Sequence, residues 1–163
     1  MLNFLVGRTI DSFQMVRIVE QSDYFDLTDT VVISYDANKM LQVLIEDPYK
    51  KIKTIQNKLD IEIRGEYKPV EVKLIPLHVD GVSKPFIVES VTTYCAIDPL
   101  ITGKWKDLER NTGNDYILGW NIKGSTEEFF LRVAYEDIVI EKIADSKVFF
   151  QHCDLGYKKC FSD

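Results

Sequence analysis

The chain has 163 residues, of which 45% are hydrophobic and 28% are charged, and its formal net charge is −6. This is the composition of a globular protein, and it excludes a disordered chain; the length suits a single globular domain over residues 1–163. Acids outnumber bases 13 to 10 in residues 1–80 and again in the remainder (26 − 13 and 20 − 10), so no segment has the basic density that binding to nucleic acid requires.

The N-terminal residues, MLNFLVGR, lack a basic region and a long apolar run, so they do not read as a signal peptide. No stretch approaches the roughly 18 apolar residues of a membrane-spanning helix. Cys95, Cys153 and Cys160 form an odd set, which favours reduced thiols. We therefore expect a cytoplasmic protein that does not bind a membrane.

Alternation of apolar and polar side chains predicts a strand at residues 13–19 and a hairpin formed by residues 30–35 and 40–46. The turn of this hairpin is DANK. One side of the hairpin is expected to be buried, with Val31 and Ile33 facing inward.

The same alternation recurs in LDIEIR at residues 59–64 and in VEVKLIP at residues 70–76, where Val72 and Leu74 are expected to face inward. Further strands are predicted at residues 86–95, 116–122, 129–135, 137–143 and 147–153. About ten strands joined by short connections indicate a mainly β fold, either an antiparallel sandwich or a partly open barrel.

Two stretches that begin with Asp-Pro interrupt the strands and predict one or two short helices. Residues 98–113 place Asp98 as an N-cap and Pro99 at the first helical position. Residues 47–58 form a shorter version that contains the one basic cluster, YKKIKTIQNK. This cluster suits the polar face of a short helix or an edge strand.

The stretch SDYFDLTD, residues 22–29, has three open readings: a solvated loop with Asx turns, a binding surface or a metal site. The spacing fails the EF-hand pattern, because positions 3, 5 and 6 from Asp23 are Phe, Leu and Thr. Residues 11–36 contain six acids and one base, a local net charge of −5. Acids beside aromatic rings are typical of a surface that docks a basic protein. The residues expected to bind such a partner are Asp23, Tyr24, Phe25, Asp26, Asp29 and Asp36.

Other chemistry finds weaker support in the sequence. The spacing of Cys153 and Cys160 does not fit a zinc knuckle, and no phosphate-binding glycine loop is present. We expect no cofactor and no metal ion. An enzyme using Cys95 with a histidine stays open, as does a pocket for a small molecule or sugar lined by Tyr94, Tyr116 and Trp120. Tyr116 and Trp120 fit a core better than a binding platform.

In general profile the chain resembles the immunity proteins that bacteria produce together with polymorphic or contact-dependent toxins. SDYFDLTD followed by TVVISYDANKMLQVLIE carries the resemblance, as an acidic and aromatic stretch leading into a hairpin. The resemblance implies a small, cytoplasmic, non-catalytic protein that covers the basic active-site cleft of a nuclease-type toxin domain. We therefore expect an inhibitor of a basic protein; the alternative is a β module that binds a small molecule or carbohydrate.

Overall fold

The computed structural model describes residues 2–20, 22–45, 52–61, 71–79, 85–96, 117–134, 137–142 and 157–162. After a short 3-10 helix, η1 (Asn3–Leu5), these residues form ten strands. The strands are β1 (Thr9–Glu20), β2 (Asp23–Tyr35), β3 (Lys39–Ile45), β4 (Ile52–Gln56), β5 (Glu71–Leu77), β6 (Phe86–Ala96), β7 (Ile117–Gly124), β8 (Glu128–Ala134), β9 (Asp137–Lys142) and β10 (Tyr157–Ser162).

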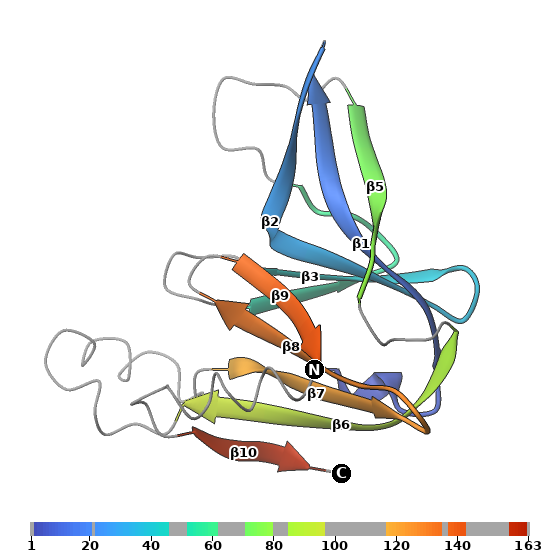
Figure 1. Ribbon diagram of the computed structural model, residues 1–163, viewed down its shortest axis with the longest axis vertical. Helices are drawn as coiled ribbons and strands as arrows, with labels where there is room; N and C mark the ends of the chain where they lie inside the picture. Colours follow the sequence, from blue (N-terminus) through green and yellow to red (C-terminus); the bar gives the residue numbers. More distant parts are fainter. Residues whose placement is uncertain are drawn as a thin grey trace, which may run out of the picture.

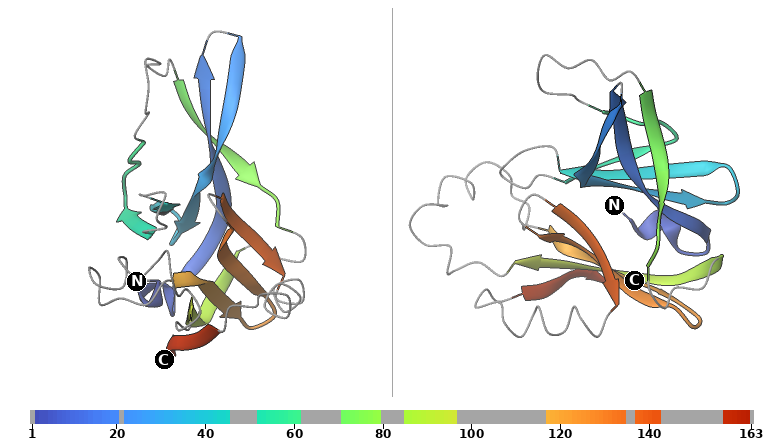
Figure 2. Two further views of the ribbon diagram at one scale, coloured as in Figure 1. Left: turned by 90° about the vertical axis from the view of Figure 1, so that its left-hand side faces the viewer. Right: turned by 45° about the horizontal axis from the view of Figure 1, so that its top comes forward.

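Pairing is antiparallel throughout the described residues, in the order β4-β3-β2-β1-β6-β7-β8-β9 (Figure 1). In addition, β5 pairs with β1 and β10 pairs with β6. In the described part of the chain, the strand pairing between the first five strands and the last five consists of Thr9 with Ile87 and Ile10 with Phe86. The sheet therefore turns a corner there, so that β9 lies close to β2 and β3 and the two halves stack as an open sandwich (Figure 2). The mainly β prediction is confirmed.

The core lies between the two halves. Phe129 of β8 packs edge-on against Phe13 of β1, with ring centroids 4.9 Å apart, and against Phe86 of β6, at 5.7 Å. Edge-to-face contacts of this kind add to the stabilisation from burying the rings. The other buried members are Leu2, Leu5, Ile10, Val31, Ile33, Tyr35, Leu41, Val43, Val79, Val88, Val91, Trp120, Ile122 and Leu131.

The predicted hairpin at residues 30–46 is confirmed by the pairing of β2 with β3. Its burial differs from the prediction, because Val32 and Gln42 on the second face are also buried. The side chain of Gln42 donates to the Asp60 carbonyl oxygen (2.9 Å) and accepts from the Asp60 amide (2.7 Å). These two hydrogen bonds hold Asp60, in the segment after β4, against the second face of the hairpin.

The short helix predicted within residues 47–58 is wrong over Ile52–Gln56, which form the edge strand β4. Three of these five residues are β-branched, and all five pair with β3. Tertiary pairing therefore overrides the Asp-Pro start signal. The alternative interpretation of the basic cluster, an edge strand, is the one that the structure supports. The other predicted helix, at residues 98–113, lies outside the described residues.

Three further predictions are corrected. The loop predicted at residues 22–29 is wrong from Asp23 onward, where β2 begins. Leu59, Asp60 and Ile61 do not form a strand, although residues 62–64 of that prediction lie outside the described part. Val72 does not face inward, because 37% of its surface is exposed on β5.

The C-terminal strands differ from the prediction as well. The strand predicted at residues 147–153 is outside the described residues, whereas β10 at Tyr157–Ser162 was not among the predicted strands.

In the parts of the chain that the structure describes, no helix has the length and apolar character needed to cross a membrane.

Candidate protein-binding site

Three strands extend beyond the sandwich as an arm, which consists of residues 16–20 of β1, residues 23–27 of β2 and strand β5 (Figure 1). β1 is the central strand of the arm. The register of β1 with β2 shifts between Gln14, which pairs with Val32, and Val16, which pairs with Leu27. The extra residues of β2 form an irregularity at which the strand bends. This bend separates the arm from the β2–β3 hairpin.

One face of the arm is polar and carries Arg17, Tyr24 and Asp26. Arg17 donates from Nε and Nη2 to the two carboxylate oxygens of Asp26, at 2.6 and 2.8 Å. The same guanidinium lies 4.0 Å from the centroid of the Tyr24 ring. The hydrogen bond from Arg17 holds the pKa of Asp26 below its usual value. Arg17 thus fixes both neighbours, although 62% of Tyr24 stays exposed.

The opposite face carries an apolar row across the arm. Phe25 pairs with Ile18, and Ile18 pairs with Val72. Residues directly opposite one another project from the same face of a sheet. Ile18 is buried at the centre of the row, whereas Phe25 is 47% exposed and Val72 is 37% exposed. The row therefore presents a partly uncovered apolar surface.

The end of the β1–β2 hairpin is negative. Glu20 pairs with Asp23, so two acids lie opposite each other. Like charges in such positions destabilise a sheet. No ion pair is found for either acid among the described residues. The arm thus combines a negative end, two exposed rings and an apolar row.

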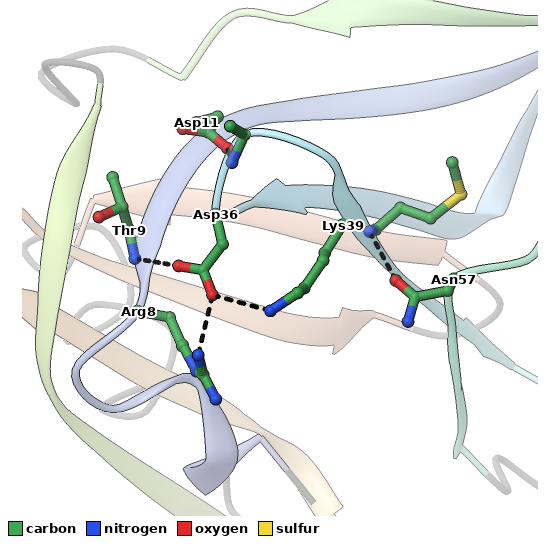
Figure 3. A network of polar contacts seen from close by, with 8 residues as sticks. Arg8, Thr9, Asp11, Asp36, Lys39 and Asn57 are labelled. Carbon is green, nitrogen blue, oxygen red and sulfur yellow. Dashed lines mark hydrogen bonds and ion pairs between the residues drawn. The ribbon is translucent and has the colours of Figure 1, made fainter.

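Asp36 lies away from the arm, in the turn between β2 and β3 (Figure 3). Its carboxylate accepts from the Thr9 amide (3.2 Å) and pairs with Arg8 (3.0 Å) and Lys39 (3.4 Å). The Thr9 hydrogen bond, together with Lys39 and Arg8, lowers the pKa of Asp36. These contacts tie the turn to β1, and they place Asp36 apart from the surface that carries Tyr24.

The six residues predicted to bind a partner are therefore not one continuous cluster. Asp23, Tyr24, Phe25 and Asp26 lie together on the arm, and Asp29 is exposed at the bend of β2. Arg17 and Ile18 on β1 and Val72 on β5 complete the arm surface, and none of these three was among the residues predicted to bind a partner. Alternation in residues 13–19 and 70–76 placed these partners on strands, but it does not show which strands become neighbours.

The residues of the alternative sites are placed only in part. Trp120 is fully buried between β6 and β8, which confirms the prediction of a core position and removes it from a binding pocket. His78 is exposed after β5. The side chains of Tyr94, Cys95, Tyr116, His152, Cys153 and Cys160 lie outside the described part. Within that part, no group of three histidine, cysteine or acidic side chains is arranged to hold a metal ion.

Comparison with known proteins identifies no relative: no protein-family model, no curated protein and no solved structure matches this chain.

Proposed function

We propose that this chain is a non-catalytic binding protein that acts in the cytoplasm and docks onto a basic protein through its arm. The proposed partner is a nuclease-type toxin domain, and binding would cover its basic active-site cleft in the manner of an immunity protein. The observation that carries the proposal is the exposure of Tyr24 (62%) and Phe25 (47%) at the end of a projecting hairpin.

Large exposed rings on a projecting strand are suited to protein recognition. Tyrosine and phenylalanine are enriched in the centres of interfaces, and tyrosine is frequent among the residues that dominate binding energy. Arg17 already holds the Tyr24 ring in place, with its guanidinium 4.0 Å from the ring centroid. A side chain that is ordered before binding loses less conformational entropy on association. The pair therefore supports Tyr24 as a preorganised anchor.

The negative charge of the arm also supports a basic partner. The net negative charge of residues 11–36 is smaller in the structure than the sequence alone suggests. Arg17 neutralises Asp26, and Arg8 and Lys39 neutralise Asp36. Glu20 and Asp23 remain side by side at the end of the arm. A negative end of this kind increases the association rate with a positively charged protein.

The direct experiment is to coexpress the chain with the product of the adjacent gene, which the proposal expects to carry a basic toxin domain, and to measure the Kd of the purified pair. The double substitution Tyr24→Ala and Phe25→Ala is expected to raise Kd by about 30-fold or more, since anchor residues contribute about 2 kcal/mol or more. Ile87→Ala is the matched control, because Ile87 is 59% exposed on β6. Equal effects of the two changes, or no complex at all, would contradict the proposal.

The role of charge needs a separate experiment. Asp23→Lys with Asp29→Lys is expected to slow association and to flatten its salt dependence between about 50 and about 500 mM. Asp26 is left intact, because its loss would release Arg17 and Tyr24. Association kinetics that do not change would remove the acids from the interface.

A further inference from the structure

The outer edge of β2 in the arm is unpaired among the described residues. Residues 23–27 pair with β1 on one side, and β3 pairs only with the later part of β2, from Thr30 to Tyr35. Figures 1 and 2 show β2 and β5 on either side of β1, so that this part of β2 is an outer strand of the arm. An outer strand presents a row of backbone N–H and C=O groups to which another strand can pair.

The two edges of the arm differ in how they resist such pairing. β5 contains Pro76, which has no amide proton to donate, and the charged side chains Glu71 and Lys73. Proline and lysine are the residues with which natural proteins protect an edge. Residues 23–27 contain neither, and they carry the exposed rings of Tyr24 and Phe25 instead. Among the described residues, the β5 edge is therefore protected and the β2 edge is left open.

We propose that residues 23–27 of β2 accept an extended strand of the partner, which joins the arm as an added strand through main-chain hydrogen bonds. This inference rests on the proposed function and gives it a binding mode. In strand addition the main chain supplies affinity, and side chains on alternate positions supply specificity. Tyr24 and Phe25 project from opposite faces of β2, so each can cover one face of the added strand.

Charge identifies the occupant as a basic strand and not a second copy of this chain. Residues 22–29 contain three acids and no base. Antiparallel pairing of two copies along residues 23–27 would bring the carboxylates of Asp23 and Asp26 from both copies onto one short ladder. Charge of one sign gathered there disfavours a second copy. A strand in which lysine or arginine alternates with apolar residues can place its bases on the face of Asp23 and its apolar residues on the face of Tyr24.

The test uses two synthetic peptides, one with alternating lysine and valine and one in which proline replaces two central valines. Both peptides have the same charge, but the second cannot donate from the substituted positions. At ten times its Kd, the first peptide is expected to slow exchange about tenfold at those amides of residues 23–27 that point away from β1. The proline peptide is expected to bind at least tenfold more weakly. Asp23→Lys should weaken binding of the first peptide, whereas Ile87→Lys on β6, outside the arm, should not.

Equal binding of the two peptides would show attraction by charge alone and would overturn strand addition. Protection at β4 or β5 in place of β2, or no protection, would do the same. Sedimentation should show a monomer, and a dimer that Asp23→Lys disrupts or tightens would overturn the choice of occupant. If the toxin complex forms and depends on Tyr24 and Phe25 while the peptides fail, the proposed function stands and only strand addition falls.

Discussion

At the scale of single residues, the turn between β2 and β3 is held by side chains against an unfavourable backbone. Asp36 and Ala37 have φ angles of +48° and +65°. Aspartate tolerates this left-handed region, but alanine does so poorly because its Cβ approaches the carbonyl oxygen. Asp11 accepts a hydrogen bond from the Ala37 amide at 2.7 Å, and Asp36 accepts one from Thr9 (Figure 3). The network stabilises a turn that the local sequence does not favour.

Ala37→Gly is therefore expected to stabilise the protein by about 0.5–1 kcal/mol, because glycine adopts the left-handed region without the steric penalty. Urea unfolding monitored by circular dichroism measures the change. The adjacent Asn38 does not have a positive φ, so Asn38→Gly is the matched control and should destabilise slightly. A loss of stability in the Ala37 variant would contradict this account of the turn.

Asp36 also predicts a dependence of stability on pH. The Thr9 amide, with the nearby Lys39 and Arg8, holds the pKa of Asp36 in the folded state below its ordinary value of 3.8. The ionised carboxylate thus favours folding at pH values above 3.8, and this contribution is lost as pH falls through the lower pKa of the folded state. A carboxyl-detected NMR titration should give a midpoint below 3.8 for Asp36.

The same contribution should disappear in Asp36→Asn, which keeps the shape of the side chain and an acceptor for Thr9. The difference in unfolding free energy between wild type and variant should shrink as the solution is made more acidic than about pH 4. A difference that stays constant between pH 7 and pH 2 would show that the charge of Asp36 has no part in holding the turn.

At the scale of elements, strand pairing decides the conformations that local signals leave open. The Asp-Pro start at residue 47 predicts a helix, yet Ile52–Gln56 pair with β3 as an edge strand. The segment after β4 is fixed by the side chain of Gln42, which is buried and makes two hydrogen bonds with the Asp60 main chain. Gln42 Nε2 also donates to the Thr30 hydroxyl at 3.1 Å. A buried polar side chain with these partners is specific for one arrangement of the chain.

Gln42→Leu is expected to cost about 2–3 kcal/mol, because the Asp60 amide and carbonyl lose their partners while the volume changes little. Hydrogen exchange of the Asp60 amide should accelerate in this variant. Lys53→Met is the control, since it removes the exposed ion pair between Lys53 and the Asp60 carboxylate (2.9 Å) and leaves Gln42 in place. Similar small effects of both substitutions would mean that the segment is held by other contacts.

At the scale of the whole molecule, the stacking of the two halves of the sheet places Trp120 fully inside the core, next to Thr93 and Leu131 in the strand register. Its buried indole Nε1 has no hydrogen-bond partner among the residues that the structure describes. Leaving a buried donor unpaired is costly, so packing must compensate for it. The position is therefore defined by shape rather than by polar contacts.

The environment of Trp120 can be read directly in a Trp105→Phe variant, because the chain contains only these two tryptophans. Emission of the folded variant is expected to be blue-shifted and insensitive to iodide, and to become red-shifted and quenched on unfolding. Quenching in the folded state would contradict the burial of Trp120. It would also reopen the hypothesis of an aromatic binding platform.

The sequence by itself determined the class of the fold and the position of most strands, because a period of two in hydrophobicity depends only on neighbouring residues. It also identified Tyr24 and Phe25 as rings beside acids. Only the tertiary structure decided the charge and shape of the surface around them. Arg17 neutralises Asp26, and Ile18 and Val72 extend the row from Phe25, through pairings between strands distant in sequence. Composition and periodicity do not encode which strands become neighbours, since that choice follows from packing the whole chain around one core.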